Sequence, residues 1–171
     1  MRVLRRRAEI ITLLALIVGP IASAQAADAD DAREPWATVN VCDTATAPNT
    51  IGIRASMPGS RGGQELMYMR FVVQYFSRAD ERWYRVAAGG DSGYLYVGKG
   101  RGPRQFGRSL RIDPLPGEPV LLRGQVWFQW RLKSGEVVRG ASERTRRGHR
   151  SDAGADPSGY SASTCTITPA D

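Results

Sequence analysis

The chain has 171 residues, a formal net charge of +7 and 42% hydrophobic residues. That length suits one ordinary globular domain with a tail and excludes a large multidomain enzyme. The near-normal apolar content, with four Trp, six Tyr and four Phe, excludes wholesale disorder.

Residues 1–26 have the pattern of a secretory signal peptide. Four arginines precede an apolar run over 10–21, and small residues then offer cleavage after Ala24 or Ala26. The run is shorter than the roughly 20 residues that a membrane-spanning helix needs. We therefore expect a secreted or cell-surface protein with no stable membrane span. Loss of residues 1–26, with four Arg and one Glu, lowers the net charge to +4.

Residues 27–35 are acidic and small, which predicts a flexible lead-in, and 36–171 is expected to form a single domain. From residue 36 onward, short β-type segments alternate with turns, and no long helical periodicity occurs. This pattern predicts an all-β antiparallel sandwich of about seven to nine strands, with a barrel as the alternative. The expected strands are 36–42, 50–56, 66–76, 82–86, 92–97, 105–112, 120–132, a return strand from 137, and 160–167.

The chain has two cysteines, Cys42 and Cys165, in the first and last expected strands. In an exported protein such a pair is typical of one disulfide, which would join these two strands. Two cysteines and the single His149 do not make a zinc site, and we expect no metal site.

Period-two alternation predicts which side chains of the longest strands share a face. Met67, Met69, Phe71, Val73 and Tyr75 share one face of their strand. In 120–132, Val126, Phe128, Trp130 and Leu132 share a face, so that Trp127 points the other way and either Trp127 or Trp130 is less buried.

The stretch 126–139, Val-Trp-Phe-Gln-Trp-Arg-Leu-Lys-Ser-Gly-Glu-Val-Val-Arg, resembles the hairpin of small exported bacterial immunoglobulin-like adhesive modules. The segments 36–42 and 160–165 resemble the ends of uncharacterised secreted actinobacterial proteins. The resemblance implies an immunoglobulin-like sandwich. The chain departs from true immunoglobulin domains, because its cysteines lie at the two ends and Ser163 stands where a tyrosine is expected. No functional residue is carried over.

Two short motifs invite a catalytic interpretation. Gly90-Asp91-Ser92-Gly93 is similar to the sequence around the nucleophile of trypsin-like serine proteases, but that family places its histidine before the serine. Here the only histidine, His149, follows it. Residues 93–99 match the start of a phosphate-binding loop, but Gly100 replaces the magnesium-binding Ser or Thr. We expect no catalytic residues and no cofactor.

Basic residues gather in two regions, and aromatic residues supply possible stacking platforms. The first basic cluster is Lys99, Arg101, Arg104, Arg108 and Arg111, and the second is Arg144, Arg146, Arg147, His149 and Arg150. Such clusters can bind polyanions, although runs of charge are usually solvated loops. The candidate ligand-binding residues are Trp83, Tyr94, Tyr96, Trp127, Lys99, Arg101 and Arg104, with core packing the simpler role for the aromatic ones.

The sequence thus favours an exported, non-catalytic binding or adhesion module. Its expected ligand is an anionic or carbohydrate polymer of the cell envelope, or another envelope protein, and not cytoplasmic nucleic acid. Two alternatives stay open, a small extracellular hydrolase and a structural envelope component.

Overall fold

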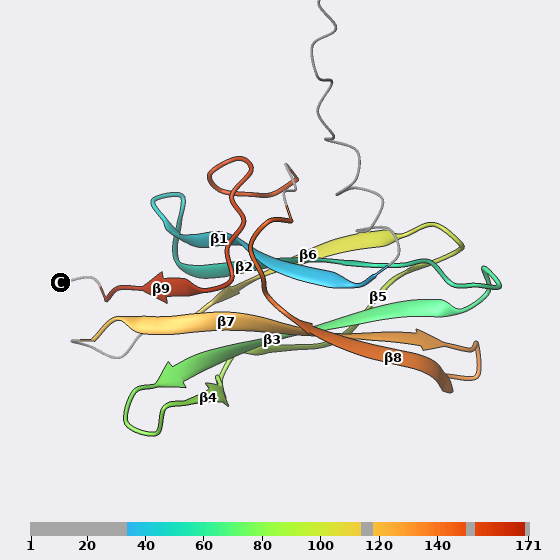
Figure 1. Ribbon diagram of the computed structural model, residues 1–171, viewed down its shortest axis with the longest axis horizontal. Helices are drawn as coiled ribbons and strands as arrows, with labels where there is room; N and C mark the ends of the chain where they lie inside the picture. The colour runs from blue at the N-terminus through green and yellow to red at the C-terminus, as the bar shows by residue number, and fades with distance from the viewer. Residues whose placement is uncertain (1–33, 114–117, 150–152, 170–171) are drawn as a thin grey trace, which may run out of the picture.

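The protein is a β-sandwich of two antiparallel sheets (Figure 1). The computed structural model describes residues 34–113, 118–149 and 153–169, and nine strands lie within these ranges. No ladder joins the two sheets in this part of the chain, which confirms the expected sandwich over a barrel. The expected signal peptide, and all of the lead-in except its last two residues, lie outside the described residues.

The smaller sheet consists of β1 (Trp36–Thr44), β2 (Ala47–Met57) and β6 (Arg104–Arg111), with β2 in the centre. Because side chains alternate along a strand, one face of β2 is buried between the sheets. Its fully buried apolar side chains are Ile51, Ile53, Ala55 and Met57.

The larger sheet has six strands and is built around β3 (Leu66–Ser77) and β7 (Val120–Arg131), which pair over ten positions. The other edge of β3 is shared by two strands, and so is the other edge of β7. These edge strands are β4 (Arg82–Arg85) and β5 (Asp91–Lys99) beside β3, and β8 (Val137–Arg144) and β9 (Cys165–Ile167) beside β7.

The hydrophobic core lies between the sheets, and its largest side chains are Phe71, Phe128 and Trp130, each at most 1% exposed. The indole N–H of Trp130 donates to the Pro58 carbonyl oxygen at 3.1 Å, so the buried donor has a partner. Alternation therefore predicted which residues of β3 and β7 share a face, and the structure shows which of the two faces is buried. At its ends the core face reaches the surface: Tyr75, paired with the buried Leu122, is 36% exposed and packs on Tyr84, and Leu132, 41% exposed, follows the last residue of β7.

The disulfide between Cys42 and Cys165 is present, with the two Cα atoms 5.4 Å apart. It joins β1 of the smaller sheet to β9 of the larger sheet. This covalent link between the layers confirms the expected pairing and is consistent with an extracytoplasmic location.

The last strand is shorter than expected, because only Cys165–Ile167 of the expected strand 160–167 forms a ladder. Upstream of it, Ala162 makes one isolated bridge with Val39. Side-chain hydroxyls supply other contacts there, with Thr38 Oγ1 bonded to Ser161 Oγ and Thr145 Oγ1 donating to the Ser163 carbonyl. Hydrogen bonds between hydroxyl side chains and nearby groups compete with the backbone hydrogen bonds of a β-ladder.

Candidate functional site

The outer face of the larger sheet carries polar and aromatic side chains. On β3 the fully buried Met69 and Phe71 flank Arg70, which therefore points away from the core. Burial alternates along β7 as well, which turns Trp127 outward, directly opposite Arg70. The face away from the core is thus built by the two central strands together.

Ladder register brings further residues to this face, because direct partners in an antiparallel pair share a side. On β5, Tyr94 lies opposite Arg70 and Tyr96 lies opposite Tyr68. On β4, Arg85 lies opposite Gln74 of β3. We call this surface the arginine–aromatic strip, and it comprises Tyr68, Arg70, Trp83, Arg85, Tyr94, Tyr96, Arg123, Trp127 and Arg131.

The arginines in the middle of the strip lie over aromatic rings. The guanidinium carbon of Arg131 is 4.3 Å from the ring centre of Tyr68 and 4.7 Å from that of Tyr94. That of Arg70 is 5.8 Å from the Tyr94 ring and 5.9 Å from the Trp127 ring. At these distances the ring quadrupole attracts the cation. The rings therefore hold the guanidinium groups in place. The ring faces are in turn covered by the arginines.

The same arrangement continues toward β4. The guanidinium carbon of Arg85 lies 5.2 Å from the Trp127 ring centre, and that of Arg123 lies 4.1 Å from the Trp83 ring centre. Arg123 also donates from Nε to the side-chain oxygen of Gln74 at 2.8 Å. All four arginines of the strip therefore contact at least one aromatic ring. By contrast, Tyr96 has no arginine over its ring among the described residues, and the residue is 53% exposed.

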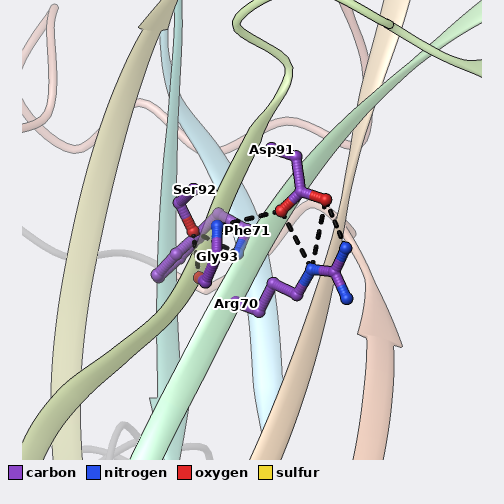
Figure 2. Close-up of polar contacts among 5 residues, drawn as sticks. All are labelled: Arg70, Phe71, Asp91, Ser92 and Gly93. Carbon is purple, nitrogen blue, oxygen red and sulfur yellow. Dashed lines mark hydrogen bonds and ion pairs between the residues drawn. The ribbon is translucent and has the colours of Figure 1, made fainter.

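One carboxylate accompanies these four arginines in an ion pair. Asp91 pairs with Arg70 and accepts from its Nε at 2.9 Å (Figure 2). The hydrogen bond with Arg70 holds the pKa of Asp91 below its ordinary value, helped by the Gly93 amide, and raises the pKa of Arg70. Among the described residues, the other three arginines have no ion-pair partner. The strip with Asp91 therefore has a net charge of +3.

Beside this ion pair, the Ser92 side chain makes hydrogen bonds with backbone groups of β3 and β5. Between the paired positions Arg70–Tyr94 and Val72–Asp91, β5 has one residue more than β3, which is a β-bulge. Ser92 Oγ accepts from the Phe71 amide at 2.9 Å and donates to the Gly93 carbonyl at 2.7 Å (Figure 2). The Asp-Ser-Gly motif thus supplies hydrogen bonds that the interrupted ladder lacks.

His149 lies in a different environment. Its ring stacks on Trp36 with the ring centres 4.7 Å apart and the planes nearly parallel. It lines a hollow of about 430 Å³ together with Glu143 and Arg146, and Ser92 is not part of that lining.

The three cationic candidates near the β5–β6 connection lie outside the strip and apart from one another in structural role. Lys99 is exposed at the end of β5, opposite Leu66, and continues the outward face by register. Arg104 begins β6 in the smaller sheet and donates to the Lys99 carbonyl at 2.6 Å. Arg101 lies in the connecting loop. Its backbone carbonyl approaches Gly59 so closely that a β-carbon on residue 59 would not fit.

The structure therefore gathers Trp83, Tyr94, Tyr96 and Trp127 on one face. It adds residues that the sequence analysis did not single out, namely Tyr68, Arg70, Arg85, Arg123 and Arg131. Period-two alternation marks Tyr68, Arg70 and Arg131 as outward. Their proximity to the aromatic candidates depends on the pairing of β3 with β7, two strands distant in sequence.

Within the described ranges, no helix is long and apolar enough to cross a membrane. In the same part of the chain, no three residues of the types His, Cys, Asp and Glu lie together as a metal site. No protein-family model matches the chain, and no curated protein matches it.

Proposed function

We propose that this protein is an exported, non-catalytic binding module whose arginine–aromatic strip binds an anionic polymer of the cell envelope. The observation that carries the proposal is the set of four arginines on one sheet face, of which only Arg70 has a carboxylate partner among the residues that the structure describes. Guanidinium groups bind carboxylates and phosphates through paired, in-plane N–H donors.

The contacts within the strip favour charge recognition over stacking on bare rings. Tyr94 and Trp127 each have two guanidinium groups over their rings. A sugar or base that stacked on them would have to displace an arginine. Arginines already held by rings lose little conformational freedom on binding, which leaves more of the interaction energy as affinity. Tyr96 is the ring most open to direct contact with a ligand.

The shape of the strip supports an extended ligand. It crosses β5, β3 and β7 in successive rows, with neighbouring strands about 4.8 Å apart. Several charged groups of one polymer can therefore bind at once, and linked contacts strengthen one another.

The immunoglobulin-like resemblance belongs to the same proposal. The orders β1-β2-β6 and β4-β3-β7-β8 parallel the A-B-E and C′-C-F-G orders of immunoglobulin-like sandwiches. An export route is supported by the signal-like sequence at 1–26 and by the disulfide.

The test is binding of the disulfide-bonded protein to polygalacturonate, with neutral dextran as the control polymer. We expect saturable binding to the polyanion that weakens as salt is added, and no binding to dextran. Equal affinity for both polymers would contradict the proposal.

A further inference from the structure

A polar hollow of about 540 Å³ adjoins the strip at its β4 end. It lies where β4, β7, β8 and the segment before β9 come together. Its lining includes Trp83, Arg123, Ser142, Arg144, Ser163 and Thr164. Arg146 and Thr145 line it as well, so three guanidinium groups, one aromatic ring and four hydroxyl-bearing residues border one space.

Arg123 and Arg144 reach this hollow from neighbouring strands. Arg144 of β8 lies directly opposite Gln125 of β7, and Arg123 is two residues from Gln125 on the same face. Such diagonal positions are within reach of long side chains. Burial lowers the pKa of Arg123, and the nearby charge of Arg144 lowers it further. The two cations therefore face each other closely enough to repel.

The acidic residue of the hollow does not neutralise this pair. Glu143 also lines the space, and its carboxylate is 3.6 Å from an Nη of Arg146. Among the described residues, Arg123 and Arg144 have no carboxylate partner. An anion placed between them would relieve their repulsion and accept hydrogen bonds from both.

Arg123 is prepared for such a role by its other contacts. Its Nε donates to Gln74, and its guanidinium lies over the Trp83 ring. Gln74 in turn donates to Gln125 at 3.2 Å. Among the described residues Arg123 donates a side-chain hydrogen bond from Nε and none from its Nη groups, which leaves these N–H donors for an anion.

We propose that this hollow is a subsite for one acidic sugar residue of the bound polymer. The acidic group lies between Arg123 and Arg144, and the hydroxyls of Ser142, Ser163 and Thr164 contact the sugar hydroxyls. The size and polar lining of the space fit a sugar ring that carries an anionic group. This inference rests on the proposed function, because it names the chemistry that the strip and its adjoining hollow recognise.

The test follows the Trp83 indole N–H by NMR while galacturonate, glucose 6-phosphate, glucose or an oligothymidylate is added to the disulfide-bonded protein. We expect galacturonate, glucose 6-phosphate or both to shift this signal, and glucose to leave it unchanged. The relative response to the two acidic sugars tells whether a carboxylate or a phosphate is preferred. A larger shift at lower concentration with the oligothymidylate would overturn the assignment to a sugar.

Variants separate the subsite from the strip. We expect Arg144→Gln to weaken acidic-sugar binding by about tenfold or more, because a charged hydrogen bond is lost. Arg108→Gln, which removes the same charge from an exposed position of the smaller sheet, should leave it unchanged. If polygalacturonate binds but neither acidic sugar shifts the Trp83 indole signal, the assignment of the subsite is wrong. The assignment is also wrong if the two variants bind acidic sugars equally well. If polygalacturonate itself does not bind, the proposed function fails.

Discussion

Arg131 lies over the ring of Tyr68, with its guanidinium carbon 4.3 Å from the ring centre, although the two residues are on different strands. Its Nε also donates to Gln129 Oε1 at 2.9 Å. The side chain is therefore fixed from two sides on the sheet surface. A fixed guanidinium is a better anion receptor than a free one, because less entropy is lost on binding.

The two tryptophans of β7 provide a matched test of the two faces. Trp130 is 1% exposed, and we expect Trp130→Ala to cost about 3–5 kcal/mol of unfolding free energy. Trp127 lies half-buried on the outer face, so Trp127→Ala should cost no more than about 1–2 kcal/mol. It should also weaken polyanion binding, since Arg85 loses its ring and Arg70 keeps only that of Tyr94. Urea unfolding and polygalacturonate titration measure both effects, and equal destabilisation by the two changes would contradict the face assignment.

The disulfide should make a large contribution to stability. It closes a loop between residues 123 positions apart, which in the chain-entropy model is worth about 4–5 kcal/mol. We expect the double variant Cys42→Ser/Cys165→Ser to melt about 10–20 °C below the native protein. Thermal unfolding followed by circular dichroism measures the difference, and native protein under reductant should match the variant. An unchanged melting temperature would show that the disulfide between the sheets does not stabilise the folded protein.

Stability should depend on acid pH through Asp91. Because the pKa of Asp91 is lowered in the folded protein, its ion pair with Arg70 contributes fully above the ordinary carboxyl pKa. The contribution is lost as pH falls through the lowered folded value. We therefore expect Asp91→Asn to be less stable than the native protein at neutral pH, and the gap to close in acid. Denaturant titrations at several pH values test this, and a gap that persists below the folded pKa would argue against the ion pair.

Ser92 should behave as a structural residue. The Phe71 amide beside it lies in a fully buried part of β3, and Ser92 Oγ accepts its hydrogen bond. We expect Ser92→Ala to lose about 1–3 kcal/mol of stability, because a buried donor is left without its partner. Ser92→Thr keeps the hydroxyl and serves as the control in the same unfolding assay. If both variants were as stable as the native protein, the bulge would not need this side chain.

Local sequence pattern was enough to predict which side chains share a strand face and which cysteines pair. Alternation along β7 places Phe128 and Trp127 on opposite faces without knowledge of the partner strands, and the structure decides which of these faces is buried. The export signal and the cysteine count together predicted the link between Cys42 and Cys165. These inferences need only information that lies along the chain.

The candidate site required long-range pairing. Arg70 and Trp127 become neighbours only in the β3–β7 register, and a shift by one residue would turn one of them into the core. The bulge at Ser92 similarly sets which β5 residues face Arg70. The last strand was overestimated because hydroxyl side chains around Ser161 and Ser163 hold that segment without a ladder.

The most direct test of the binding proposal compares two double variants with the same loss of charge. Arg70→Gln/Arg131→Gln removes two guanidinium groups from the strip, whereas Arg108→Gln/Arg111→Gln removes two from the smaller sheet. Calorimetric titration with polygalacturonate at fixed ionic strength should show affinity reduced about tenfold or more in the first variant and little changed in the second. Equal loss in both variants would show that binding follows overall charge, and would contradict a specific site on the strip.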